Sequence, residues 1–220
     1  TKVIVLVSKP PAAKVAKKVL AGAAKAKKPV VVCFVGSETR VRNEGPLWFV
    51  PTLESAAVDG FFAALNAAAT TAADESDIEV ELPFAPKQRY VRGLYSGGTF
   101  CYEASSLLGQ ALGDVWSNAS VRDDRVLEDV WKSKGHTVID LGDDAFTRGR
   151  PHPMIDHRLR NERIVQEAND PETAVLLLDV VLGHGAHPDP VAAMRPAIDK
   201  ANAIAEKKGR TLAIVGFVCG

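Results

Sequence analysis

The chain has 220 residues, 46% of them hydrophobic, and its 27 Lys and Arg residues balance 27 Asp and Glu residues. A neutral balance without a basic stripe excludes an electrostatic footprint for nucleic acid. No apolar run approaches the roughly 20 residues that a membrane-spanning helix needs. The N-terminal stretch TKVIVLVSKPP has the pattern of a strand and not of a signal peptide, so we expect a cytoplasmic protein. Cys33, Cys101 and Cys219 are too widely spaced for a zinc ribbon or a disulfide framework, and we expect buried or loop thiols.

The first part of the chain predicts alternating strands and helices. The runs VIVLV at 3–7 and VVVCFV at 30–35 are continuously apolar and β-branched, which is typical of parallel strands covered on both faces. The alanine- and lysine-rich stretch 12–28 between them predicts a helix with a solvated lysine face. LWFV at 47–50 predicts a further strand, and Thr52 is the expected N-cap of a helix over 52–66.

The composition then changes. The stretch TTAADESDIEVELPFAP, residues 70–86, is acidic, poorly periodic and closed by two prolines, which favours a linker. We therefore predict a first unit over 1–70, a linker over 71–86 and a second unit over 87–220.

Strand and helix patterns alternate again after the linker. Strands are predicted near 89–96, at 138–141, 174–180 and 212–217, and helices over 101–112, 157–170 and 189–209, the last interrupted or restarted near Pro196. This alternation predicts an α/β fold of two flavodoxin-like, parallel-sheet units. Ligands of such sheets bind beyond the carboxyl ends of the strands. That rule selects the loops at 96–99, 142–156 and 183–189, and the residues after Cys219.

The first of these loops is glycine-rich. YSGGTF places Ser96, Gly97, Gly98 and Thr99 between a strand and a helix, where glycines permit close approach of a ligand and free helix amides favour an anion. The loop is either a binding site for an anion or acyl oxygen, or only a tight turn.

The second loop, GDDAFTRGRPHPMID, restrains its own backbone. Pro151 and Pro153 flank His152, and Arg148 and Arg150 supply forked donors suited to a carboxylate or a phosphate. We expect the two arginines to bind a small anionic substrate and His152 to act in acid–base catalysis.

Three carboxylates accompany this loop. Asp143, Asp144 and Asp156 have the charge to hold the arginines or to orient His152, and Asp156 is the second expected catalytic residue. The alternative is structural, with Asp156 capping the next helix and His152 merely packing.

The third loop is LGHGAHPDP. His184, Gly185 and His187 are expected ligand-binding residues, and Asp189 precedes a proline at the start of a helix. Two imidazoles and a carboxylate would be a possible metal set. Histidines three apart in a glycine-rich loop more often form hydrogen bonds, so we predict no metal site.

The motifs carry a family resemblance. The runs HTVIDLGDDAFTRGRPHPMIDHRLRNERI and AVLLLDVVLGHGAHPDP, with VIVLVSKPP, KPVVVCFVG and RGLYSGGTFCYEA, resemble the FdrA family of acyl-CoA-synthetase-like proteins, relatives of the succinyl-CoA ligases. The resemblance implies a pair of flavodoxin-like CoA-ligase domains, with helix N-termini directed to the cleft between them. CoA or a nucleotide as cofactor is implied by the resemblance only.

The chain departs from that family in two places. Succinyl-CoA ligases carry a phosphorylated histidine after the strand that resembles KPVVVCFVG, whereas here SETRVRNEGPLWFV contains no histidine. We therefore expect no phosphohistidine. The CoA-binding domain that FdrA-like proteins usually carry is also missing upstream, so we expect a fragment or one subunit of an assembly.

Two functions remain open. One is an enzyme or catalytic subunit that handles an activated acyl group, by forming a thioester or an acyl phosphate as an acyl-CoA ligase does, or by transferring a carbamoyl group. The resemblance favours the last, in the form of oxamate carbamoyl transfer in allantoin breakdown. The other is a non-catalytic scaffold or ligand-binding subunit. In either case we expect a homo-oligomer or partner subunits, and no nucleic acid or membrane partner.

Overall fold

A computed structural model of the protein describes residues 1–37, 41–65, 81–120 and 122–220. The chain divides into two compact units, Thr1–Glu79 and Val80–Gly220. Most of the expected linker, 71–80, lies outside the described residues, and 81–86 form no helix or strand.

The first unit is a four-stranded sheet in the order β1-β2-β4-β3. Three strands are parallel, and β3 runs antiparallel to β4. β2 is central and buried because its neighbours and α2 enclose it. The elements are β1 (Ile4–Ser8), α1 (Ala13–Ala23), β2 (Val30–Phe34), β3 (Arg42–Glu44), β4 (Leu47–Phe49) and α2 (Leu53–Leu65).

Thr52 caps α2, as the sequence predicts. Its hydroxyl oxygen accepts a hydrogen bond from the amide of Ser55 at 3.1 Å, which satisfies one of the free amides at the helix start.

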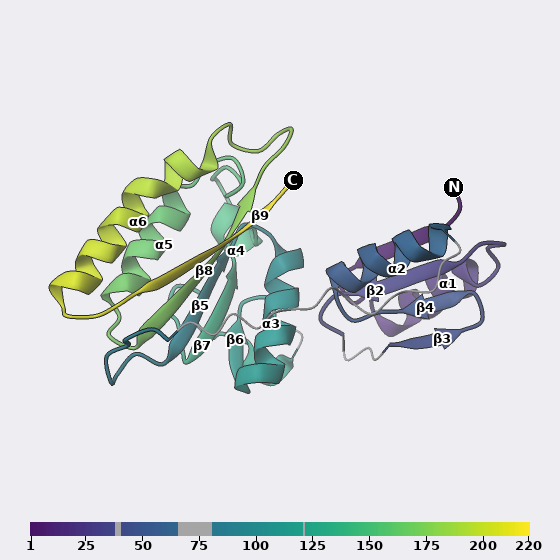
Figure 1. The fold of residues 1–220 in the computed structure, drawn as a ribbon, viewed down its shortest axis with the longest axis horizontal. Helices are drawn as coiled ribbons and strands as arrows, with labels where there is room; N and C mark the ends of the chain where they lie inside the picture. The colour runs from purple at the N-terminus through teal and green to yellow at the C-terminus, as the bar shows by residue number, and fades with distance from the viewer. Residues whose placement is uncertain (38–40, 66–80, 121) are drawn as a thin grey trace. The chain divides into compact units, whose positions relative to one another are not determined.

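The second unit is a five-stranded, wholly parallel sheet in the order β6-β7-β5-β8-β9 (Figure 1). Two separate apolar clusters lie on its two faces. Residues of α5 and α6 form one, and residues of α3 the other. The elements are β5 (Tyr90–Tyr95), α3 (Gly98–Leu112), β6 (Val115–Ser117), the 3-10 turn η1 (Asp123–Arg125), β7 (His136–Asp140), α4 (Asp144–Thr147), α5 (Arg158–Asn169), β8 (Thr173–Val181), α6 (Pro190–Lys207) and β9 (Ala213–Cys219).

The predicted α/β class and parallel sheets are confirmed. The strands expected at 3–7, 30–35, 138–141, 174–180 and 212–217 are all present, with ends shifted by at most two residues. Their apolar runs identify the strands, but not how far each is buried. β2, β7 and β8 are largely buried, whereas β1 and β9 lie at sheet edges. Val5 and Val7 of β1 are exposed, so the expectation that 3–7 is covered on both faces is wrong.

Two strands were missed. β3 has the exposed sequence Arg-Asn-Glu and pairs with β4 through a turn at Gly45, whose φ is +62°. β6 is only three residues long. Neither carries the apolar run that identifies the other strands.

Two helices differ from expectation. α3 begins at Gly98, three residues earlier than predicted, so Gly98 and Thr99 belong to its first turn. α6 continues through Pro196, where a break was expected. Pro196 is exposed, so the carbonyl that its missing amide leaves free faces water.

The buried face of α5 carries charged residues. Glu167 accepts hydrogen bonds from Arg163 at 2.7 Å, Arg92 of β5 at 3.2 Å and the Ser133 hydroxyl at 2.6 Å, and both arginines are at most 3% exposed. Arg92 also pairs with Asp170 at 2.9 Å. This network joins α5 to the amino-terminal half of the sheet, away from the strand ends expected to bind ligands.

Candidate functional site

The connections between strands in the second unit change from one face of the sheet to the other at β5. The chain leaves β5 through α3 on one face, whereas it leaves β7 through α4 and α5 on the other face to reach β8. Loops that diverge in this way leave a crevice at the carboxyl ends of the two strands. The first two loops selected from the sequence, at 96–99 and 142–156, follow these two strands.

Gly142 is the point where the two loops meet. A Cβ atom built on Gly142 would lie 2.7 Å from Nε2 of His152, 2.8 Å from the carbonyl oxygen of Ser96 and 3.1 Å from Oδ1 of Asp140. All three distances are shorter than ordinary van der Waals contacts of a Cβ atom. The close approach of these three groups to the backbone at residue 142 therefore requires glycine. The structure therefore brings together His152, Ser96 and Asp140, of which Asp140 was not predicted.

His152 has a defined orientation. It is half-buried, and its Nδ1 accepts a hydrogen bond from the amide of Met154 at 3.3 Å. Because Nδ1 is an acceptor here, the neutral ring carries its proton on Nε2, the atom that lies over Gly142. An N–H donor in this position is a candidate for proton transfer to a ligand at the strand ends.

Asp140, at the end of β7, holds the backbone of Gly142 in place. Its buried carboxylate accepts the amide of Gly142 at 2.9 Å, and its backbone exchanges two hydrogen bonds with the side chain of Asn118. These bonds fix the end of β7 and so the position of Gly142.

Ser96 is held by a buried ion pair. Asp179, at the end of β8, accepts the Ser96 amide at 2.9 Å and the Ser96 hydroxyl at 2.6 Å. The same carboxylate pairs with Arg160 of α5, and each of these side chains is 1% exposed. Sequence reasoning missed both residues, although an aspartate inside the apolar run LLLDVV is a signal for a buried, partnered charge.

The glycine-rich turn leads directly into a helix. Gly97 is the N-cap of α3, without a side-chain cap, and the first-turn residues Gly98 and Thr99 follow it. The N-terminal amides of a 15-residue helix therefore begin beside the carbonyl of Ser96. Such amides favour an anion or a developing oxyanion.

The aspartates of the proline-rich loop have local partners. Asp143 caps the short helix α4 by accepting the amide of Ala145 at 2.9 Å, and Asp144 is in the first turn of that helix. Asp156 accepts the amide of Arg158 at 3.0 Å and pairs with its guanidinium at 2.5 Å. These hydrogen bonds lower the pKa of Asp156 to about 2.

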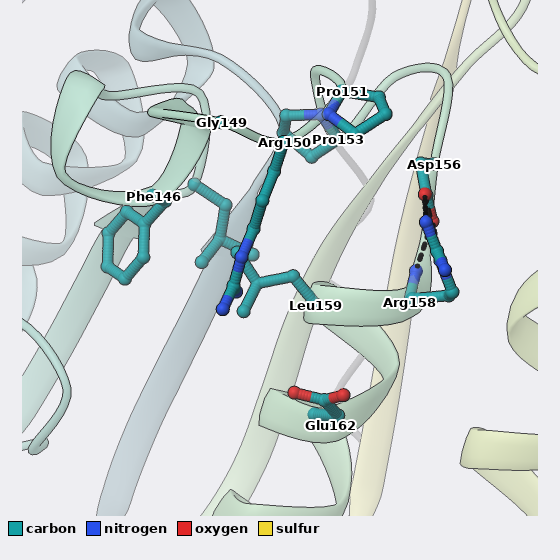
Figure 2. Close-up of a pocket in the computed structure, with 10 residues that line it drawn as sticks. Phe146, Gly149, Arg150, Pro151, Pro153, Asp156, Arg158, Leu159 and Glu162 are labelled. Atoms are coloured by element: carbon teal, nitrogen blue, oxygen red, sulfur yellow. Dashed lines mark hydrogen bonds and ion pairs between the residues drawn. The ribbon is translucent and has the colours of Figure 1, made fainter.

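The two arginines of this loop, Arg148 and Arg150, lie in different surroundings. Arg150 lines a pocket beside the start of α5, together with Pro151, Pro153 and Asp156 (Figure 2). Both arginines are exposed, and Arg148 does not line that pocket. His152, between the two prolines, is directed to Gly142 and does not line it either.

The third loop contacts the second through His187. Its amide donates to the carbonyl of Met154 at 2.8 Å, and its ring lies edge-on to His157, with centroids 5.3 Å apart. His184 and Gly185 are exposed, and Gly185 has a φ of +87°.

His157 is a buried residue that sequence reasoning did not select. It is 5% exposed, and neither ring nitrogen has a hydrogen-bond partner within the described structure. Burial, the Arg160 guanidinium and His187 lower its pKa to about 4. His157 is therefore neutral at pH 7.

Within residues 1–37, 41–65, 81–120 and 122–220, no group of three or more His, Cys, Asp or Glu side chains could hold a metal ion. None of the helices in the described ranges is both long and apolar enough to cross a bilayer.

The sheet order and the helices on both faces define a doubly wound α/β domain. Residues 94–220 match the family model of the CoA-ligases, and this match covers more than half of the chain. The chain belongs to the CoA-ligase family, within the acyl-CoA synthetase and succinyl-CoA ligase superfamily. Ser96, Asp140, Gly142, His152 and Asp179 all lie in the matched region.

One curated relative matches along the whole chain. The uncharacterized protein YahF of Escherichia coli (strain K12) is 42% identical over 232 residues, which cover 100% of this chain and 44% of that protein. The chain thus spans less than half the length of this relative.

Proposed function

We propose that this chain is an FdrA-like part of a larger enzyme that transfers a small acyl or carbamoyl group at the crevice around Gly142. The observation that carries the proposal is the convergence of His152 Nε2, the Ser96 carbonyl and Asp140 at that glycine. Membership of the CoA-ligase family supports an activated acyl group as the class of substrate.

Each part of the crevice has a role in such a transfer. The N-terminal amides of α3, from Gly98 onward, stabilise the negative charge that develops on a carbonyl oxygen or a phosphate. The Nε2 proton of His152 is available to the leaving atom. Asp179 and Asp140 keep the two loops in place and do not touch the substrate.

The specific reaction that we propose is carbamoyl transfer. When a carbamoyl group passes from the nitrogen of carbamoyl-oxamate to phosphate, a C–N bond breaks, a C–O bond forms and the leaving nitrogen gains a proton. His152 supplies that proton, with no change in oxidation state. A phosphohistidine route lacks its acceptor, since residues 37–50 contain no histidine.

The test compares two reactions of the same preparation. We expect phosphate release from carbamoyl phosphate in the presence of oxamate, and no thioester from succinate, ATP and CoA. His152→Gln should retain ligand affinity and lower the turnover number by about a hundredfold or more. A phosphorylated histidine found by mass spectrometry after incubation with ATP would contradict carbamoyl transfer and favour the ligase reaction.

A second candidate is a non-catalytic assembly subunit. The edge strand β9 favours it, because Val215, Phe217 and Val218 are more than half exposed and the strand contains no charged residue. Exposed, uncharged edge strands are sites of pairing with another chain. A stable complex with a partner protein, together with no turnover by either the parental chain or its His152→Gln variant, would support this role over catalysis.

A further inference from the structure

A pocket of about 260 Å³ lies between the proline-rich loop and the first turn of α5 (Figure 2). Leu141, Phe146 and Leu159 line its base, and the first two are 0% and 2% exposed. The rings of Pro151 and Pro153 continue this apolar surface. Four charged side chains also line the pocket: Arg150, Asp156, Arg158 and Glu162. Concave sites that combine apolar walls with convergent polar groups are typical of small-molecule sites.

Of the two arginines that line the pocket, Arg158 has a carboxylate partner and Arg150 has none among the residues that the structure describes. Arg158 is held by Asp156, and Glu162 one turn further along α5 also raises the pKa of its guanidinium. Arg150 forms no ion pair with a carboxylate in the described part of the chain. Its guanidinium lies 6.0 Å from the centre of the Trp131 ring.

The backbone directs Arg150 to this position. Gly149 has a φ of +77°, which side chains other than glycine rarely adopt, and the amide of Arg150 closes a turn onto the carbonyl of Thr147 at 2.9 Å. Pro151 then restrains the next peptide unit. A cation at the edge of an apolar floor is thus a built feature of the loop.

We propose that this pocket binds a monocarboxylate with a small, branched apolar body. The carboxylate pairs with Arg150, and the apolar body packs on Leu141, Phe146 and Leu159. Asp156 is already paired with Arg158, and the carboxylate of Glu162 repels a second carboxylate, so dicarboxylates are disfavoured. The site stands apart from the proposed transfer reaction, because Ser96, Gly142 and His152 do not line it.

Direct titration of the full chain tests the ligand class. By calorimetry, isovalerate should bind about tenfold or more tightly than acetate, since it buries additional methyl groups. Succinate and the uncharged amide of isovalerate should bind more weakly than isovalerate. Equal affinity for acetate and isovalerate, or for the acid and its amide, would overturn the proposal.

Two arginine variants locate the site. Arg150→Ala should weaken isovalerate binding by about tenfold or more, the scale of a lost charged hydrogen bond. Arg148→Ala removes the same charge from the same loop outside the pocket, and binding should stay within about twofold, as for a surface charge. Equal losses in the two variants would show a general charge effect and reject the pocket.

The fluorescence of Trp131 gives a second measurement of binding, independent of calorimetry. A bound carboxylate draws the Arg150 guanidinium from the Trp131 ring, so isovalerate should change the intrinsic fluorescence of the parent chain. The change should disappear in Trp131→Phe, while calorimetry still detects binding. A fluorescence change that persists in Trp131→Phe would place the ligand elsewhere and refute the site.

Discussion

Asp179 accepts hydrogen bonds from both the backbone amide and the hydroxyl of Ser96, at 2.9 and 2.6 Å. The two residues are 83 positions apart in the sequence. Arg160 completes the arrangement by donating to the carboxylate and, at 2.6 Å, to the carbonyl of Asp179. One buried carboxylate therefore connects the ends of β5 and β8 to α5.

Replacing that carboxylate should destabilise the second unit strongly. Asp179→Asn leaves the buried Arg160 charge without its counterion, and we expect a loss of about 3–5 kcal/mol in the free energy of unfolding. Ser96→Ala removes one neutral donor to the same acceptor and should cost about 1–3 kcal/mol. Urea denaturation measures both. A smaller loss for Asp179→Asn than for Ser96→Ala would show that Arg160 finds another partner.

Gly142→Ala tests the convergence in the crevice. The added methyl group meets His152, Ser96 and Asp140 at 3.1 Å or less, so we expect a loss of about 1–3 kcal/mol in stability. The displaced imidazole should also lower any transferase activity.

Gly97→Ala is the matched control for that substitution. Gly97 has a φ of −161°, an ordinary extended value, and nothing lies within 4 Å of its Cβ position. Alanine is less favourable than glycine at this N-cap, but without the crowding Gly97→Ala should lower the urea midpoint less than Gly142→Ala does. If the two alanine variants unfold at the same midpoint, the crowding at Gly142 is relieved by loop movement.

The stability should fall as the pH is lowered from about 6.5 to about 4. The pKa of His157 is about 4 in the folded chain and 6.5 as its ordinary value, so the unfolded chain binds more protons in this window. Stability then rises with pH up to the unfolded value and is constant above it. Thermal unfolding at a series of pH values measures the slope.

His157→Phe should flatten this slope while keeping the ring contact with His187. Burial also lowers the pKa of His136. This histidine should therefore leave a smaller increase of stability with pH in the variant. Asp156 titrates near pH 2, below the window. An unchanged slope in His157→Phe would assign the pH dependence to His136 or to other groups.

Glu167→Gln should destabilise the chain because two buried arginines lose their shared carboxylate. We expect a loss of about 3–5 kcal/mol, measured by urea denaturation. Glu172→Gln is the matched control, since Glu172 pairs with Arg89 at the surface and both side chains are more than a third exposed. Its midpoint should equal that of the parent. Equal effects in the two variants would contradict the importance of burial.

Much of the fold could be predicted from local sequence. Continuous apolar runs such as 30–35 identify strands that are buried on both faces, and Thr52 identifies a helix start through its own hydroxyl. The loops at 96–99 and 142–156 follow two neighbouring strands, as expected, because parallel strands place their carboxyl ends at one edge of the sheet.

The charged face of α5 could not be predicted in the same way. Arg160, Arg163 and Glu167 recur at helical spacing, which normally marks a solvated face, yet each is at most 3% exposed. Their partners lie on β5 and β8 and in the segment that contains Ser133. Helical periodicity shows that residues share a face, and only the packing of distant elements decides whether that face is buried.

The sequence by itself determined the alternation of strands and helices and the restrained loop around His152. Tertiary structure alone decided that His152 lies over Gly142 while Arg150, two residues earlier, lines a separate pocket. It also decided that Asp179 holds Ser96. The physical reason is that strand and helix propensities act between neighbours in the chain, whereas side-chain direction in a loop is set by the hydrogen bonds and packing of segments far apart in the sequence.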